Sequence, residues 1–275
     1  MLTSLNTAVS GLQQFQQQIN VIGNNIANVN TVAYKNVRAT AADAFSDTLQ
    51  GAMGPGVQVG RGVTTGGVSS VFTQGNITYT GAPTDLAVSG GGFFTVRDPA
   101  SGATYATRDG SFHIDKSGYL VNSQNLRVQG FSDSGLASRG DVRMDMSGSP
   151  ADTPADAQIS SYRFDAQGKL QLTLDTGSTY VRGQVLLQDF TSPQSLMKEG
   201  NNLYSNLASA GPLVQATAPG SGGLGTITAQ NLETSNVDLA GEFTDLITAQ
   251  RGFQANSRVI TTSDELLQDV INLKR

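Results

Sequence analysis

Hydrophobic residues recur every seven positions at both ends of the chain. In the first thirty residues they form two series that stay three positions apart. The first series is Leu5, Leu12, Ile19 and Ile26, and the second is Ala8, Phe15, Ile22 and Val29. This spacing places both series on one side of an α-helix, as in coiled coils. The pattern predicts a packed helix over residues 3–30.

A second helix is predicted over residues 236–272. Its seven-residue series is Leu239, Leu246, Phe253, Ile260 and Leu267. The flanking positions are mixed in polarity, so the apolar seam is narrower than in the first helix. Gly241 and Gly252 lie inside this helix, and each costs roughly 1 kcal/mol relative to Ala. Such a helix is expected to depend on close packing with its neighbours.

Between the two ends the pattern changes to short β-prone runs bounded by Gly, Asn, Asp or Pro. The runs are 57–63, 68–72, 77–80, 86–88, 93–96, 105–108 and 119–121. The segment FHIDKSGYL (112–120) is echoed fifty residues later by YRFDAQGKL (162–170). Each segment predicts two strands around a turn, with Asp115 or Asp165 capping the turn and a glycine supplying a positive φ. The segments 132–157 and 208–225 are predicted to be long loops.

These patterns predict an α+β fold, with paired N- and C-terminal coiled-coil helices and a central all-β domain of short strands. The predicted terminal helical domain comprises residues 1–38 and 232–275. The central β-domain is predicted over residues 39–231, and its long loop at 132–157 is a plausible place for an inserted domain.

The polar face of the first helix is uncharged. It carries Gln13, Gln14, Gln16, Gln17, Gln18, Asn20 and Asn24. Amides bond to other amides and to backbone without the cost of burying a charge. Two interpretations stay open, an ordinary amphipathic helix with a biased polar face and a helix surrounded by copies of itself. The asparagines at 24–30 predict a helix end followed by a hydrogen-bonding loop.

Composition and candidate chemistry do not specify a reaction. The net charge of −5 argues against nucleic acid as a partner, and no apolar run is long enough for membrane insertion. Cysteine is absent, so thiolate metal sites are excluded. His113 is the one histidine, and an exposed strand position is a better interpretation than a catalytic one. We predict no catalytic, cofactor or metal site, although a secreted β-rich enzyme or binding module stays an alternative class.

The first helix and the loop after it resemble bacterial flagellar rod and hook proteins. The family pattern S-G-x…N-N-I-A-N-x-N-T-x-x-[YF]-K is met at Ser10, Gly11, Asn24, Asn25, Ile26, Ala27, Asn28, Asn30, Thr31, Tyr34 and Lys35. Segments 73–94, 107–131, 199–205 and 221–273 also resemble the family. Within it, 118–131, the closing VINLKR and the short linker 45–56 favour the hook protein. The chain length and the lack of the hook's additional β-domain at 132–160 favour the distal rod protein, the second choice.

The resemblance implies a structural subunit without enzymatic activity. Family members pair their terminal helices into an inner coiled-coil tube, so the two seven-residue series are the expected self-assembly residues. The expected hook would join basal body to filament, transmit torque and leave a central export channel. Expected partners are copies of the chain, the rod, hook-cap and hook–filament junction proteins, and the flagellar type III export apparatus. The expected location is the extracytoplasmic hook and basal body, reached without a cleaved signal peptide.

Overall fold

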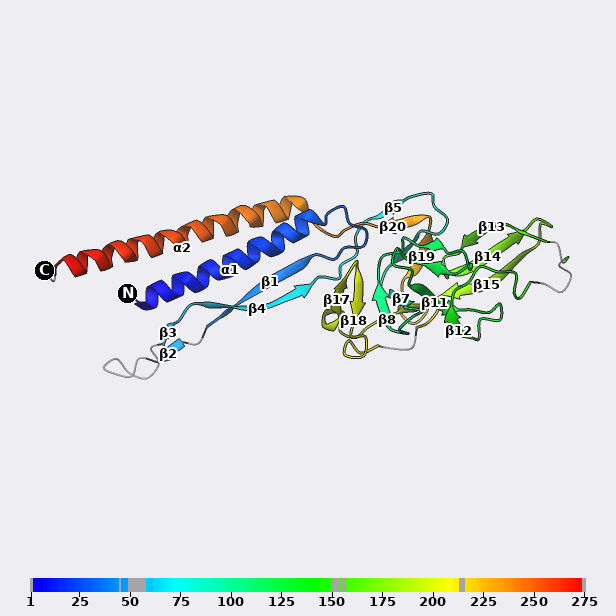
Figure 1. Cartoon of the computed structure of the whole chain (residues 1–275), viewed down its shortest axis with the longest axis horizontal. Coiled ribbons are helices and arrows are strands. Elements are labelled where there is room, and N and C mark those ends of the chain that lie inside the picture. Colours follow the sequence, from blue (N-terminus) through cyan, green and yellow to red (C-terminus); the bar gives the residue numbers. More distant parts are fainter. Residues whose placement is uncertain are drawn as a thin grey trace. The chain divides into compact units, whose positions relative to one another are not determined.

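The computed structural model describes residues 2–44, 46–48, 58–149, 154, 157–212 and 216–273. The chain divides into two units, which we call the helical unit and the β unit (Figure 1). The helical unit contains residues 1–29, 35–71 and 237–275, and the β unit contains residues 30–34 and 72–236.

Both predicted helices are confirmed, as α1 (Leu2–Ala27) and α2 (Leu239–Leu273). The side-chain amide of Asn28 donates to the carbonyl oxygen of Asn24 at 2.8 Å. The backbone amide of Asn28 donates to the same oxygen at 3.2 Å and to the Asn25 carbonyl at 3.1 Å, and α1 ends at Ala27, three residues before the predicted end at residue 30. At the start of α2, the Asp238 carboxylate accepts a bond from the Ala240 amide at 3.1 Å and caps the helix.

The two helices lie side by side and run antiparallel (Figure 1). Three contacts fix their register. Asn25 meets Glu242, the ring of Phe15 lies over Gly252, and Gly11 faces Asn256. As the residue number rises on one helix it falls on the other, which defines the antiparallel direction. The finer coiled-coil pairing stays a prediction.

A β-hairpin of β1 (Val37–Asp43) and β4 (Val63–Ser70) lies along α1 in the same unit. Between them, β2 (Ser46–Thr48) pairs with β3 (Gln58–Gly60). This grouping differs from the predicted boundary after residue 38, because the hairpin bonds to α1 rather than to the other strands. The Thr65 hydroxyl lies 2.9 Å from the amide oxygens of both Gln14 and Gln17.

The β unit is built on a twelve-stranded sheet within the described residues. Its main path runs β13-β14-β15-β11-β7-β8-β18-β17, with β9, β10, β12 and β16 beside it. The strands are β7 (Phe93–Arg97), β8 (Thr104–Thr107), β9 (His113–Ile114), β10 (Leu120–Val121), β11 (Arg127–Phe131), β12 (Arg139–Asp141), β13 (Ile159–Phe164), β14 (Lys169–Leu174), β15 (Thr179–Val185), β16 (Leu187–Gln188), β17 (Met197–Gly200) and β18 (Leu203–Ser205). A 3₁₀ turn spans Pro193–Ser195.

Alternation of polarity explains why these segments become strands. Along β14 the leucines at 170, 172 and 174 are buried and the residues between them are half-buried. Period-two burial is the pattern of a strand that covers a core with one face. The main core joins residues from both halves of the unit, including Leu86, Phe94, Val128, Leu172 and Ile227.

Two further strand pairs bring distant parts of the chain into the β unit. β6 (Leu86–Ser89) pairs with β19 (Thr226–Ala229), and β5 (Ile77–Tyr79) pairs with β20 (Asn231–Glu233). Residues 30–34 belong to the same unit, since the Ala33 amide donates to the Glu233 carbonyl at 2.8 Å. The predicted limits of 39 and 231 therefore omit segments that the structure groups with this domain.

The loop predicted at 132–157 is more ordered than expected over its described part. It contains β12, which pairs with β11, and Val142 is fully buried. Asp141 accounts for this order, because its carboxylate lies 2.8 Å from Arg97 and 3.0 Å from Arg127. Residues 150–153, 155–156 and 213–215 of the two predicted loops lie outside the described residues.

The other strand predictions largely agree with the structure. The runs at 77–80, 86–88, 93–96 and 105–108 each overlap a strand, and so does the run at 119–121. Val57, at the start of the first run, lies outside the described residues.

The two echoed turns are confirmed. The Asp115 carboxylate accepts bonds from the amides of Ser117 and Tyr119, each at 2.8 Å. Asp165 repeats the arrangement with the amides of Gln167 and Lys169. The intervening glycines have φ values of 84° at Gly118 and 75° at Gly168. Both aspartates therefore act as turn caps.

Candidate functional site

The apolar series of α1 is directed largely inward within the helical unit. Ala8 and Ile22 are 4% and 5% exposed. The other predicted assembly residues of α1, namely Leu5, Leu12, Phe15, Ile19 and Ile26, are half-buried. A single chain thus covers this series only in part.

The apolar series of α2 is less buried within one chain than the series of α1. The most buried positions are the small flanking residues Ala249 and Ser263, at 1% and 8% exposure. Among the predicted assembly residues of α2, Leu246, Ile260 and Leu267 are half-buried, whereas Leu239 and Phe253 are exposed. Small side chains face α1 because the helices approach closely there, so two of the large apolar side chains remain at the surface.

Gly252 marks the closest approach of the two helices. A Cβ atom at this position would lie 2.4 Å from the nearest ring atom of Phe15, which is well inside van der Waals contact. A glycine that is unfavourable for an isolated helix is therefore required by the packing of this pair. This agrees with the sequence-based expectation that α2 depends on close neighbours.

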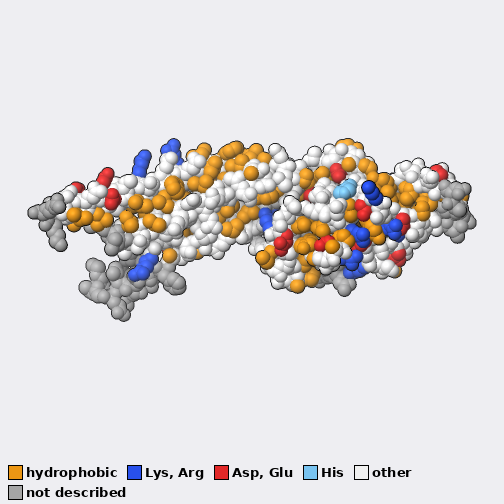
Figure 2. All heavy atoms as spheres, viewed as in Figure 1, with side chains coloured by type: hydrophobic (Ala, Val, Ile, Leu, Met, Phe, Trp, Pro, Cys, Tyr) orange, Lys and Arg blue, Asp and Glu red, His pale blue; other side chains and the backbone are white. Residues whose placement is uncertain are grey.

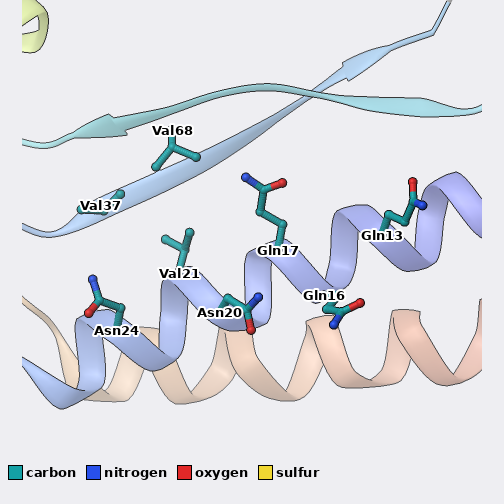
Figure 3. Close-up of a pocket in the computed structure, with 8 residues that line it drawn as sticks. All are labelled: Gln13, Gln16, Gln17, Asn20, Val21, Asn24, Val37 and Val68. Carbon is teal, nitrogen blue, oxygen red and sulfur yellow. The ribbon is translucent and has the colours of Figure 1, made fainter.

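Amide side chains line an open groove of about 510 Å³ between α1 and the hairpin (Figure 3). From α1 come Gln13, Gln16, Gln17, Asn20, Val21 and Asn24, and from the hairpin come Val37 and Val68. No charged side chain is among these eight residues. Groups of this kind offer both donors and acceptors to a neighbouring backbone or amide.

Asn25 joins three elements of the helical unit. Its amide nitrogen donates to the Val37 carbonyl at 2.9 Å and to the Glu242 carboxylate at 3.0 Å. Its oxygen accepts the Val37 amide at 3.0 Å, and the residue is 1% exposed. Burial raises the pKa of Glu242, although the hydrogen bond from Asn25 lowers it. The nearby carboxylates of Asp245 and Asp238 raise it further. The motif asparagine is therefore a buried connector.

The other motif residues fall in both units. In the helical unit Lys35 is 1% exposed, Ile26 and Asn28 are half-buried, and Asn24 and Ala27 are exposed. In the β unit Tyr34 is buried, Thr31 is half-buried and Asn30 is exposed. The Tyr34 amide donates to the Thr31 carbonyl at 3.3 Å. The motif is therefore distributed between the units.

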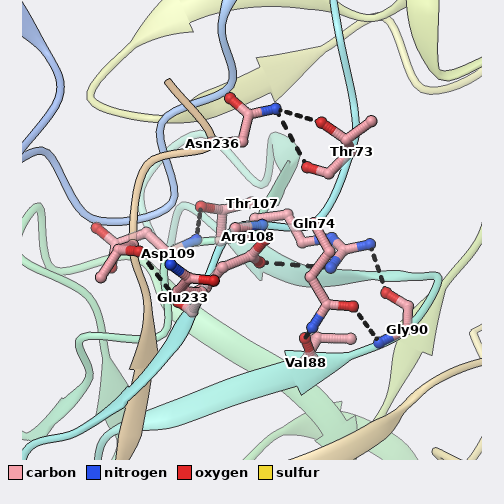
Figure 4. Close-up of polar contacts among 12 residues, drawn as sticks. Thr73, Gln74, Val88, Gly90, Thr107, Arg108, Asp109, Glu233 and Asn236 are labelled. Carbon is pink, nitrogen blue, oxygen red and sulfur yellow. Dashed lines mark hydrogen bonds and ion pairs between the residues drawn. The ribbon is translucent and has the colours of Figure 1, made fainter. Parts of the chain in front are cut away.

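A buried ion pair lies in the β unit, and sequence patterns did not reveal it (Figure 4). A guanidinium nitrogen of Arg108 lies 3.4 Å from the Glu233 carboxylate, and the two side chains are 6% and 0% exposed. Arg108 also donates to the Gly90 carbonyl at 2.9 Å, and Glu233 accepts the Gly75 amide at 2.8 Å. Burial lowers the pKa of Arg108, and the Glu233 carboxylate opposes that shift.

The candidate catalytic groups do not converge. His113 is exposed on β9, and both echoed aspartates are occupied as turn caps. The glycines of 89–94 serve strand geometry, since a Cβ at Gly90 would lie 2.9 Å from the Gly225 Cα. In the described part of the chain, no three His, Cys, Asp or Glu side chains cluster as metal ligands would. None of the described helices is long and apolar enough to cross a bilayer.

Comparison with known protein families identifies three matching segments. Residues 5–35 match "Flagella basal body rod protein", residues 87–173 match "Flagellar hook protein FlgE/F/G D1 domain", and residues 228–273 match "Flagellar basal body rod FlgEFG protein C-terminal". A solved structure, that of the Helicobacter pylori flagellar hook protein FlgE2, aligns with a TM-score of 0.23 and 17% identity over 48% of this chain and 39% of that chain.

Several curated relatives match over the full length. The flagellar basal-body rod protein FlgG of Bacillus subtilis is 39% identical over 283 residues, covering 100% of both chains. In Borreliella burgdorferi, FlgG is 34% identical over 286 residues, again covering 100% of both chains. The flagellar hook protein FlgE of that bacterium is 25% identical over 444 residues and likewise covers both chains.

These relatives do not support placing the hook protein first. Two features behind that preference also lie partly outside the described residues, namely the linker 45–56 and the last two residues of VINLKR. The family itself is supported along the whole chain. This chain belongs to the flagellar rod and hook (FlgE/F/G) family, whose members are structural subunits of the flagellum and not enzymes.

Proposed function

We propose that this chain is a distal rod subunit of the flagellar basal body. The observation that carries the proposal is the comparison within one bacterium. The Borreliella rod protein aligns over 286 residues at 34% identity, whereas the hook protein requires 444 aligned residues and reaches 25%. A chain of 275 residues matches the length of the rod protein and lacks room for the additional hook segment.

The central β unit supports the same choice. Hook proteins of this family carry an additional β-domain in the middle, for which 132–160 is the corresponding place. Over its described part this segment holds the three-residue strand β12. Asp141 ties that strand to Arg97 and Arg127, so the short connection has its own anchoring contacts.

The terminal helices supply the proposed assembly surface, and coiled-coil pairing between copies completes it. Phe243, Ile247, Val259 and Leu266 are 42% to 58% exposed on α2. Several exposed large apolar side chains along one helix are typical of a surface that another protein covers. The two seven-residue series would then be buried partly within the chain and partly by neighbouring copies.

The remaining properties follow from the rod assignment. The chain has no catalytic role, and its partners are copies of itself and the neighbouring rod and hook proteins. It reaches the extracytoplasmic basal body through the flagellar export apparatus without a cleaved signal peptide. The absence of cysteine suits such a location, since no thiol is exposed to oxidation.

Genetic replacement tests the assignment. The chain would be expressed in two Bacillus subtilis strains, one lacking its own FlgG and the other lacking its hook protein. We expect rod completion and swimming to return in the first strain and not in the second, with both measured by electron microscopy of basal bodies and by motility. Rescue of the hook deletion alone would overturn the rod assignment.

A further inference from the structure

Charge in the terminal helices is confined to α2. Helix α1 contains no charged residue, whereas the middle and the end of α2 carry separate groups of opposite sign. Arg251 and Arg258 lie in its middle, and Glu265 and Asp269 lie near its end, while Glu242, Asp245 and Asp264 are its other charged residues. Figure 2 shows that charged groups on the helical part are few, and that blue and red groups lie at separate places.

One outward face of α2 carries the side chains of Arg251, Arg258, Glu265 and Asp269. Ala249, Asn256 and Ser263 face inward, and 251, 258 and 265 each follow one of them by two positions. Two residues turn an α-helix by about 200°, so these charges lie opposite the α1 contact. All four residues are exposed.

The described structure gives none of these four side chains an ion pair. Arg251 contacts the amide of Gln254 at 3.4 Å. Arg258 and Glu265 are separated by seven residues, or about 10 Å along the axis, which is too far for a salt bridge between them. Their charges are therefore available to another molecule.

The arginine pair and the carboxylate pair of α2 suit contact with a shifted copy of the same helix. The midpoint of the arginine pair and the midpoint of the carboxylate pair are 12.5 residues apart, which corresponds to about 19 Å along α2. Copies that assemble head-to-tail keep their helices parallel. Parallel helices in equal register would place arginine beside arginine and carboxylate beside carboxylate. A shift of about 19 Å instead places the arginines of one copy beside the carboxylates of the next.

We infer that neighbouring copies of this chain contact each other through this charged face of α2, in parallel and shifted by about 19 Å. The inference rests on the proposed function, because it specifies how rod subunits recognise one another. Exposed Val259 and Leu266 lie within the same part of α2, so the contact would also cover apolar surface. The charges set the register and the apolar residues add contact area.

Charge reversal tests the pairing in purified full-length protein. Arg251→Glu with Arg258→Glu makes all four positions acidic, and Glu265→Arg with Asp269→Arg makes all four basic. We expect each double variant alone to need a roughly tenfold higher concentration to polymerise. An equal mixture of the two, and the chain with all four changes, should polymerise like wild type. Lys116→Glu with Arg163→Glu on the β unit is the control and should change little.

Cross-linking measures the shift directly, because the chain contains no cysteine of its own. In assembled rods a short bis-maleimide should link Arg251→Cys/Glu265→Cys chains into ladders, and should not link Arg251→Cys chains. Links between Arg251→Cys chains, or normal polymerisation of either reversed variant, would overturn the inferred contact. In those outcomes rods still form and the proposed function stands. Failure of the wild-type chain to form rods at all would overturn both.

Discussion

Asn25 illustrates at the scale of one residue why the N-terminal motif is rich in asparagine. Its amide donates to two oxygens and accepts one backbone amide, while the residue is almost fully buried. A charged side chain cannot both donate and accept in this way. Asn24, the preceding residue, is exposed, and its oxygen accepts a bond from Asn28 at 3.1 Å.

The two asparagines therefore should respond differently to the same change. Asn25→Asp removes the donor and buries a carboxylate beside Glu242, so we expect the free energy of unfolding of the helical unit to fall by about 3 kcal/mol. Asn24→Asp keeps an acceptor for Asn28 and should change the free energy of unfolding by less than about 0.5 kcal/mol. Denaturant titration followed by circular dichroism measures both. Equal effects would contradict the connector role of Asn25.

Gly252 and Gly23 form a second matched pair of residues. A Cβ at Gly252 would collide with Phe15, whereas a Cβ at Gly23 meets nothing within 4 Å. Gly23→Ala should stabilise α1 by up to about 1 kcal/mol through helix propensity. Gly252→Ala should instead destabilise the unit by about 1 kcal/mol, since overpacking exceeds that gain. Thermal unfolding measures the effect of each substitution. Phe15→Leu should relieve the destabilisation caused by Gly252→Ala.

Asp141 predicts how the β unit responds to acid. Burial opposes its ionisation, but bonds from Gln129 and Arg127 outweigh burial and hold the pKa below the ordinary 3.8. The ionised carboxylate therefore stabilises the folded state above pH 3.8, and this stabilisation is lost as the pH falls through the lowered pKa. In Asp141→Asn we expect a weaker dependence of unfolding free energy on pH below about 4. If the unfolding free energy of Asp141→Asn depended on pH below about 4 as strongly as that of wild type, this role of Asp141 would be contradicted.

At the scale of elements, the β unit depends on segments from both ends of the chain. β19 and β20 pair with β6 and β5, and Ala33 bonds to Glu233. Glu233 also neutralises Arg108 inside the unit. Removing one partner of a buried pair leaves an uncompensated charge, which typically costs 3–5 kcal/mol.

This dependence predicts the limits of a stable fragment. A fragment of residues 30–236 should unfold cooperatively, whereas residues 39–231 should be much less stable because Arg108 loses Glu233. Glu233→Gln in the longer fragment should reproduce much of the loss, by about 3 kcal/mol. Fluorescence or circular dichroism melting curves compare the three proteins. Identical melting temperatures for the two fragments would show that the end segments are dispensable.

At the scale of the whole molecule, the proposed assembly gives the exposed apolar positions of α2 a role. Leu12 is half-buried within one chain, whereas Phe253 is 37% exposed. The two residues belong to equivalent seven-residue series, but the monomer covers them to different extents. Substitutions at these positions can therefore separate folding from polymerisation.

We expect Leu12→Asp to weaken both the monomer and its assembly, because a carboxylate without a partner would enter the contact between elements. Phe253→Asp should leave the monomer within about 1 kcal/mol of wild type while abolishing rods and motility. His113→Ala should change neither property. Monomer unfolding, electron microscopy and swimming assays measure the outcomes. Loss of function in His113→Ala with normal assembly of both aspartate variants would favour chemistry in the β unit.

The local patterns in the sequence were sufficient for the helices, most short strands and the echoed aspartate turns. Seven-residue and two-residue periodicities arise within one element, and the Asp115 and Asp165 caps involve residues at most four positions apart. The family motif was likewise visible within the segment 10–35. Each of these features depends on neighbours in sequence.

Tertiary structure alone decided which of those residues are buried and which elements belong together. Asn25 meets Glu242 across 217 positions, and Arg108 meets Glu233 across 125. Nothing periodic links such pairs, because their proximity results from strand pairing and helix packing over the whole chain. The same packing places the hairpin on α1 and the small residues of α2 inward. Phe253 stays at the surface because the ring of Phe15 from α1 already fills the close helix contact beside Gly252.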